Sequence, residues 1–155
     1  MAEDNTLQRL QQLEDAASLK RLVDTFSILA DQKDVGTQVL LFTENATVET
    51  FVNGLSAMTL QGRDQIGNAF GAYLDTFDTV YHLNGQFTVD ISGNRAKGTS
   101  YCLVVLIGSE NGVAIKNTSG VYYNDEYVRT GDGWQIAKRT SHFTWSEREP
   151  LATGS

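Results

Sequence analysis

The sequence predicts one α+β domain, with helices from the first half of the chain packed on an antiparallel sheet built by the second half. Apolar residues recur at helical spacing in the first half, and long β-type runs separated by turn signals fill the second half. Because the helices are grouped before the strands and do not alternate with them, the order favours α+β over a doubly wound parallel sheet.

The first helix is expected from about residue 7 to residue 33, a stretch that contains no Gly or Pro. Its apolar residues form one stripe, made by Leu19, Leu22, Val23, Phe26, Leu29 and Ala30. Gly36 is a stop signal, and residues 37–42 could add one or two helical turns. A further helix is expected over residues 63–77, where apolar residues again lie close to one face.

Strands are expected wherever apolar and polar residues alternate between turn signals. Residues 46–52 alternate in this way, and Asn53-Gly54 predicts a hairpin turn into a second strand over residues 55–60. Four longer runs lie between about Thr79 and Ser146, separated by turns at 92–94, 110–112 and 131–133. They predict a strongly bent antiparallel meander. We expect residues 1–155 to form a single domain, with an ordered core over about 7–146 and short flexible ends.

Composition excludes several classes of function. The formal net charge of −7 argues against a nucleic-acid partner, which needs a basic stripe to displace counterions from phosphates. There is no run of eighteen apolar residues, so no membrane span is expected, and the sequence Met-Ala-Glu-Asp-Asn lacks the features of a signal peptide. We therefore expect a cytoplasmic protein with no membrane partner.

Metal and cofactor chemistry have no signature in the sequence. Cys102 lies in an apolar run typical of a buried strand, so it is expected in the core and not as a nucleophile. Two His and one Cys scattered among strands do not form a zinc-like cluster, and phosphate-loop and dinucleotide patterns are missing. We expect no metal and no cofactor.

Four motifs carry a family resemblance. They are Leu-Phe-Thr-Glu-Asn-Ala at 41–46, Gly-Arg-Asp-Gln-Ile at 62–66, Ser-Gly-Val-Tyr at 119–122 and Gly-Trp-Gln-Ile-Ala-Lys-Arg at 133–139. In their order and spacing they resemble the SnoaL-like branch of the nuclear transport factor 2 superfamily. The resemblance implies a cone-shaped fold, with N-terminal helices on a curved antiparallel sheet that encloses a pocket. It also implies a homodimer formed through the outer face of the sheet.

The resembling family is functionally mixed, so fold alone does not decide function. It includes polyketide cyclases, scytalone and bile-acid dehydratases, a dehydrochlorinase and ketosteroid isomerase. In the dehydratases and the dehydrochlorinase, a His abstracts a proton and an Asp holds its imidazole; the matching residues here are His82 and Asp31. The chemistry is reasonable because His titrates near neutral pH and a carboxylate fixes its tautomer and stabilises the imidazolium.

The residue pattern by itself does not favour a pocket position for either Asp31 or His82. Asp31 falls roughly 140° from the centre of the apolar stripe, nearer to solvent than to a pocket. Strict alternation puts His82 on the opposite strand face from Phe87, although a bulge at Gly85 would reverse the phase. A lone His is most often structural or solvated, and an Asp near a helix end is usually solvated.

Alternatives to both members of the dyad stay open. Asp34 lies closer to the apolar stripe than Asp31, and His142 could replace His82 as the base. Phe26 takes the place of the family's usual aromatic five residues before the dyad Asp, so a Tyr hydroxyl that assists some dehydratases is absent.

Four further residues are candidates for substrate binding, together with Phe26. Arg139 matches an Arg that some relatives place in the pocket, where it could orient a carboxylate or oxyanion; a surface ion pair is the alternative. We expect Arg139 to contribute to ligand binding more than to folding. Tyr101, Tyr122 and Trp145 could line the cavity, although aromatic residues in strands are more often core.

The sequence therefore predicts a cofactor-independent lyase or isomerase that removes a proton from a small, fairly apolar cyclic substrate. His82 would be the base and Asp31 its orienting partner. The alternative is a non-catalytic ligand-binding or dimerisation domain of the same fold.

Overall fold

The computed structural model describes residues 2–152. Its helices are α1 (Ala2–Asp31), α2 (Val35–Gln38) and α3 (Gly62–Leu74), with a short 3₁₀ helix η1 (Val39–Leu41) after α2. Its strands are β1 (Phe42–Val52), β2 (Leu55–Gln61), β3 (Thr79–Ser92), β4 (Arg95–Glu110), β5 (Val113–Thr130) and β6 (Gly133–Pro150). The expected flexible ends fall partly on residues 1 and 153–155, which lie outside the described residues.

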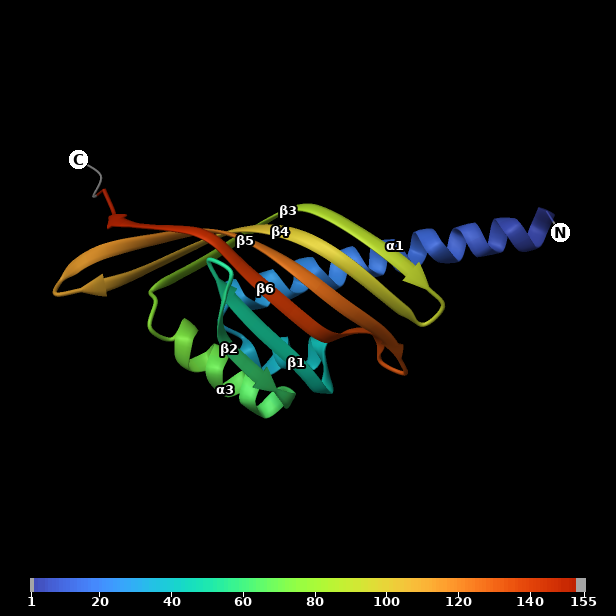
Figure 1. Cartoon of the computed structure of the whole chain (residues 1–155), viewed down its shortest axis with the longest axis horizontal. Coiled ribbons are helices and arrows are strands. Elements are labelled where there is room, and N and C mark those ends of the chain that lie inside the picture. Colours follow the sequence, from blue (N-terminus) through green and yellow to red (C-terminus); the bar gives the residue numbers. More distant parts are fainter. Residues whose placement is uncertain (1, 153–155) are drawn as a thin grey trace.

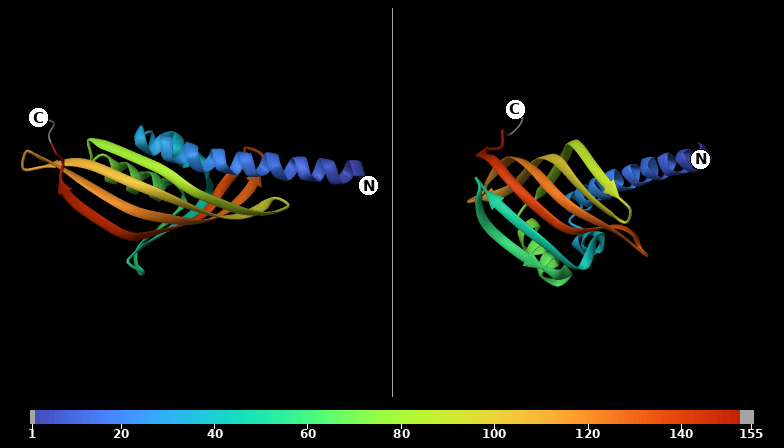
Figure 2. Two further views of the ribbon diagram at one scale, coloured as in Figure 1. Left: turned by 90° about the horizontal axis from the view of Figure 1, so that it is seen from above. Right: turned by 45° about the vertical axis from the view of Figure 1, so that its right-hand side comes forward.

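The six strands form one curled sheet in the order β2-β1-β6-β5-β4-β3 (Figures 1 and 2). The meander from β3 to β6 is antiparallel throughout, as the turn signals predict. The sheet as a whole is mixed, because β1 pairs with β6 in parallel. This pairing corrects the expectation of a wholly antiparallel sheet. The α+β class and the curved sheet covered by helices are confirmed.

The helices lie on one face of the sheet, which we call the inner face, with α1 against β3 and α3 against β1 (Figure 2). Two apolar clusters fill the space between these layers. The first surrounds Phe26, whose ring packs edge-on against Phe42 and Phe70 with centroids 5.7 and 6.2 Å away. The second contains Ala30, Leu74, Val80, Cys102, Val104, Leu106, Val121 and Tyr123.

The N-terminal part of α1 projects beyond the sheet (Figure 1). Residues 4–14 are exposed, and the helix first meets the sheet at Asp15, which is buried. The Asp15 carboxylate accepts two hydrogen bonds from Arg129, at 2.6 and 2.7 Å, and one from Trp134 Nε1 at 3.2 Å. The Arg129 guanidinium also lies 4.4 Å from the centre of the Trp134 ring. This cluster attaches α1 to the turn between β5 and β6.

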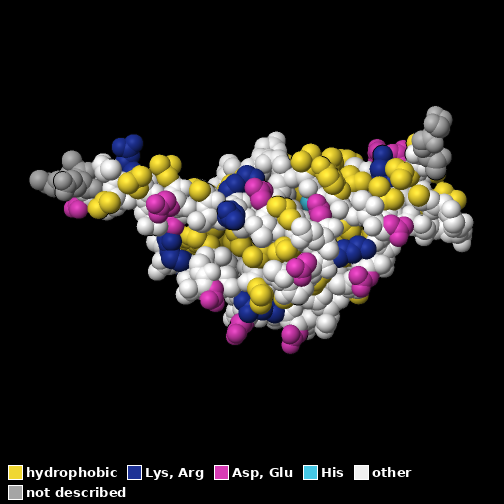
Figure 3. Space-filling model, turned by 180° about the vertical axis from the view of Figure 1, so that it is seen from behind, with side chains coloured by type: hydrophobic (Ala, Val, Ile, Leu, Met, Phe, Trp, Pro, Cys, Tyr) yellow, Lys and Arg dark blue, Asp and Glu magenta, His cyan; other side chains and the backbone are white. Residues whose placement is uncertain are grey.

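Basic side chains on the face seen in Figure 3 lie among acidic ones and form no continuous basic stripe there. Within the described residues, none of the helices has the length and hydrophobicity needed to cross a membrane. Over the same range, no three His, Cys, Asp or Glu side chains are grouped so as to hold a metal ion.

Candidate functional site

The structure brings Asp31 and His82 together. Asp31 is the last residue of α1 and His82 lies near the start of β3, and Nδ1 of the ring is 2.7 Å from Oδ1 of the carboxylate. Since a carboxylate oxygen only accepts hydrogen bonds, Nδ1 must be the donor. A neutral His82 in this tautomer carries its lone pair on Nε2, the nitrogen that could accept a proton from a substrate.

A β-bulge explains why His82 faces inward. The pairing of β3 with β4 is regular on either side of an irregularity between Asn84 and Phe87, which contains Gly85. This extra length reverses the alternation, so that His82, Asn84 and Phe87 are all turned toward the helices, while Tyr81 is exposed on the other face. The bulge that the sequence allowed at Gly85 is thus present.

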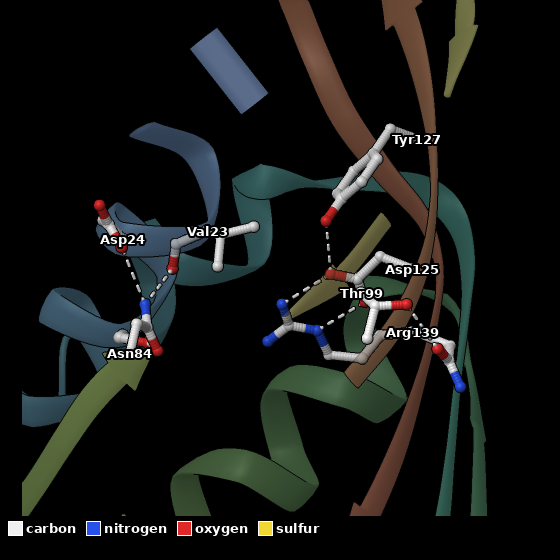
Figure 4. Close-up of polar contacts among 9 residues, drawn as sticks. Val23, Asp24, Asn84, Thr99, Asp125, Tyr127 and Arg139 are labelled. Carbon is white, nitrogen blue, oxygen red and sulfur yellow. Dashed lines mark hydrogen bonds and ion pairs between the residues drawn. The ribbon is translucent and has the colours of Figure 1, made fainter. Parts of the chain in front are cut away.

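A second polar contact aligns α1 with β3 one to two helical turns before the dyad (Figure 4). Asn84 Nδ2 donates to Asp24 Oδ1 at 3.0 Å and to the Val23 carbonyl at 3.4 Å, and Ser27 Oγ donates to Asn84 Oδ1 at 3.0 Å. Asp24, Ser27 and Asp31 share one stripe of α1 because they are three to four residues apart. This polar stripe therefore faces β3 as well, beside the apolar stripe, which packs on Phe87, Val89 and Ile91 of the same strand.

The surroundings of His82 hold its pKa below the usual value of 6.5. Burial is the largest cause, because an apolar environment disfavours the imidazolium; the nearby charge of Arg139 acts in the same direction. The hydrogen bond and the charge of Asp31 oppose this shift and only partly offset it. The side chain is 10% exposed. At neutral pH the ring is therefore uncharged, as a general base requires.

Arg139 lies in the interior and holds a buried ion pair (Figure 4). Its Nε and Nη2 donate to the two oxygens of Asp125, each at 2.9 Å, and the Tyr127 hydroxyl donates to Asp125 Oδ2 at 2.8 Å. The guanidinium lies between the rings of Phe26 and Tyr123, 4.2 and 4.0 Å from their centres. Burial acts to lower the pKa of Arg139, but the charge and hydrogen bonds of Asp125, together with Tyr123 and Tyr127, outweigh it and keep that pKa above its usual value. Two of the predicted residues, Phe26 and Arg139, are thus in contact.

Cys102 is buried in the second apolar cluster, on the same face of the sheet as the dyad. Burial raises the pKa of its thiol to about 11. The thiol is thus protonated at neutral pH, as expected for a core residue and not for a nucleophile.

The predicted aromatic residues Tyr101, Tyr122 and Trp145 lie on the outer face of the sheet, away from the dyad. Tyr101 and Tyr122 are directly paired across β4 and β5, and their rings stack at 5.6 Å. Tyr122 also stacks on His142 at 4.4 Å, so His142 shares this face. Trp145 is 46% exposed and covers Gly120, its partner on β5. The structure does not bring these side chains together with His82 and Asp31.

The rival acid, Asp34, caps α2 instead of meeting His82. Its Oδ1 accepts a hydrogen bond from the backbone N–H of Thr37 at 3.2 Å, and the side chain is exposed.

Two open grooves lie elsewhere on the surface. One of about 360 Å³ lies on the outer face around Lys97 and Lys138, and one of about 560 Å³ lies beside Asp15. The dyad lines neither groove.

Sequence reasoning missed two residues of this region, Asn84 and Asp125. Asn84 has the same strand parity as His82 and is two residues away, which could have marked it as a neighbour of α1. Nothing in the local sequence distinguishes Asp125, since its pairing with Arg139 depends on the register of β5 and β6.

The curled sheet with helices on its inner face is the fold of the nuclear transport factor 2-like superfamily. The model of the SnoaL-like domain matches residues 11–140, and the chain belongs to this family. An uncharacterised protein of Mycobacterium tuberculosis is 26% identical over 139 residues, which cover 88% of this chain and 90% of that protein.

Two solved structures illustrate the likeness of fold. A candidate scytalone dehydratase from Novosphingobium aromaticivorans has a TM-score of 0.76 at 19% identity, covering 88% of each chain. A hexachlorocyclohexane dehydrochlorinase has a TM-score of 0.75 at 18% identity, covering 93% of each chain. At these identities the similarity shows a common fold and no more.

Proposed function

We propose that the protein is a cofactor-independent lyase or isomerase, in which His82 takes a proton from a small, fairly apolar cyclic substrate. The observation that carries the proposal is the 2.7 Å contact between His82 Nδ1 and Asp31 Oδ1. It leaves Nε2 as the basic atom. Two proteins of similar fold, a hexachlorocyclohexane dehydrochlorinase and a candidate scytalone dehydratase, support this class of reaction.

Asp31 has two roles in the proposed reaction. Its carboxylate fixes the ring in the tautomer with the proton on Nδ1, and it stabilises the imidazolium that forms when Nε2 takes the substrate proton. Elimination or rearrangement of the resulting carbanion-like species then releases product. Apolar neighbours of the dyad, including Ala30, Val80 and Val104, favour an apolar substrate.

The test is a screen of small cyclic ketones, alcohols and halides with the wild type and three variants. His82→Ala should lower turnover by roughly 10²–10⁴-fold, the usual contribution of a general base. Asp31→Asn should also lower it, because an amide can accept the Nδ1 proton but cannot stabilise the imidazolium charge. His142→Ala removes the other histidine of the chain, which lies on the outer face, and should leave turnover unchanged. Full turnover in His82→Ala would refute the proposal.

A non-catalytic binding or dimerisation domain is the second candidate, favoured by the outer face of the sheet. Large apolar side chains there are 39–55% exposed: Tyr81, Leu83, Tyr101, Leu103 and Trp145. We propose that this face joins two copies into a homodimer, with each copy binding a small molecule. The cytoplasmic location expected from the sequence stays a prediction.

Light scattering after gel filtration distinguishes the oligomeric state. The wild type should have twice the mass of one chain, and Leu83→Glu should be monomeric, because the charge would be buried without a partner. Lys97→Glu, on the polar part of the same face, is the matched control. A monomeric wild type would refute the dimer proposal. A dimer that turns over no substrate in the screen would favour the binding domain over the enzyme.

A further inference from the structure

Lys33 follows Asp31 by two residues and has a backbone conformation that residues with side chains rarely adopt. Its φ angle is 56°, in the left-handed region that favours glycine. Its N–H donates to the Ala30 carbonyl at 2.9 Å, and the Asp34 N–H donates to the Leu29 carbonyl at 2.9 Å. These bonds form the Schellman motif that ends α1, where glycine is the usual residue. The turn itself therefore does not require a lysine.

The side chain of Lys33 has a distant partner. Its ammonium donates to the backbone carbonyl of Phe77, at the end of the connection from α3 to β3. One residue later, the Asp78 N–H donates to the Ile107 carbonyl at 2.7 Å, which is where the chain enters the sheet. His82 follows on the same strand.

The corner between α1 and α2 is thus attached twice to one short segment of chain. Asp31 contacts His82, and Lys33 contacts Phe77 five residues earlier. The Asp31 side chain is 27% exposed, so it could turn to solvent if the corner moved away from β3. The lysine contact opposes that movement with a charge-assisted hydrogen bond, which is stronger than one between neutral groups.

We propose that Lys33 is a positioning residue for the dyad, which holds the end of α1 on the start of β3 and so keeps Asp31 within hydrogen-bond reach of His82. It acts through Asp31 and does not contact substrate. The inference rests on the proposed function, in which the Asp31–His82 pair is the catalytic unit.

Nitrogen-15 NMR of the imidazole rings tests this geometry without a substrate. The chain has two histidines, so a His142→Gln background leaves only the signals of His82. In this background, with Lys33 intact, the His82 Nδ1 proton should be downfield and slow to exchange, and Nε2 should be unprotonated at neutral pH. Lys33→Met keeps the aliphatic stem and loses the donor. In this variant the proton signal should broaden into exchange with water, and the ring should populate both tautomers.

Two further variants separate positioning from folding. Lys33→Gly suits the positive φ angle, so it should fold and still lose the Nδ1 signal, whereas Lys33→Arg keeps a donor and should retain it. Once a substrate is known, Lys33→Met should lower kcat on the order of tenfold and change KM by less than about twofold. Lys116→Met is the matched control, because it removes an amine that pairs with Glu149 on another part of the surface. Lys116→Met should change neither the His82 Nδ1 signal nor the kinetic constants.

The outcomes are distinct for the two proposals. A normal Nδ1 signal and normal turnover in Lys33→Met would overturn the positioning role and leave the dyad intact. Loss of the signal only together with loss of far-UV circular dichroism would also overturn it, in favour of a purely structural contact. A protein with Lys33 intact that lacks the hydrogen-bonded Nδ1 proton, or His82→Ala with full turnover, would refute the proposed function itself.

Discussion

Replacing Asp125 by Asn removes the counter-ion of Arg139 and leaves the shape of the site almost unchanged. The two side chains are 0% and 2% exposed, so water cannot easily replace the lost charge. Breaking a buried ion pair from one side costs about 3–5 kcal/mol, because an unpaired charge stays in the interior. For a domain of this size, each kcal/mol shifts the melting temperature by about 2–4 °C. Asp125→Asn should therefore lower the melting temperature by roughly 6–20 °C.

A double-mutant cycle shows whether the cost comes from the pair. Arg139→Met should also destabilise, since it leaves the Asp125 carboxylate buried without its main partner. The double variant has no buried charge at this position, so it should be more stable than the sum of the two single effects by at least about 1–2 kcal/mol. Urea unfolding followed by circular dichroism measures all four proteins. Single variants that each cost under about 1 kcal/mol, or strictly additive costs, would refute this reasoning.

The same pair revises what the motif alone predicts for Arg139→Lys. From the sequence we expect weaker binding of an anionic ligand and little change in stability. The structure adds a cost to folding, because one ammonium cannot reproduce two parallel hydrogen bonds to Asp125 or the stacking on Phe26 and Tyr123. The role of Arg139 in ligand binding stays a prediction.

Three more perturbations have defined outcomes. In Asp31→Asn the pKa of His82, which burial already lowers, should fall further because the carboxylate charge that raises it is gone. The acidic limb of the pH–rate profile should therefore move to lower pH. A shift of this limb to higher pH would contradict the prediction. The pKa of Asp15 is held at about 2, mainly by hydrogen bonds from its arginine partner, so the wild type should lose stability as the pH falls from about 4 toward 2. Asp15→Asn should lack that loss in acid unfolding and be less stable at neutral pH by about 1–3 kcal/mol. In Gly120→Ala the added methyl carbon would lie 2.0 Å from Trp145 Nε1, so the indole must move outward. The fluorescence emission of tryptophan should then shift to the red, while the melting temperature stays almost unchanged. Unchanged emission would show that the backbone moves instead.

The fold was predictable from the sequence because each element has a local signal. Turns with Asn or Gly delimit the strands, and Asn53, Gly54, Asn111 and Gly112 all have the positive φ angles that those residue types tolerate. The parallel contact between β1 and β6 has no such signal. It depends on which edge of β1 is still unpaired when β6 is added to the sheet, and the tertiary packing of the chain decides this.

The site was less predictable because two simple rules fail near the dyad. Strand alternation assigns His82 to the wrong face unless the bulge at Gly85 is included, and sequence can allow a bulge without requiring it. The helical wheel assigns Asp31 to solvent because it assumes that only the apolar stripe of α1 faces protein. The polar stripe that carries Asp31 also faces protein, since Asn84 on β3 satisfies its side chains.

If His82 is the proposed general base, its surroundings would have to meet two requirements, and different neighbours would meet each one. The ring has to be unprotonated before the reaction, and burial among apolar residues supplies this condition by lowering its pKa. In the proposed reaction the imidazolium would also have to be stabilised, and Asp31 would supply this through its charge and its hydrogen bond. Arg139 would work against the second requirement, because its positive charge disfavours the imidazolium. Asp125 lies directly on that guanidinium and weakens its field at His82, so the buried ion pair would also protect the basicity of the proposed base.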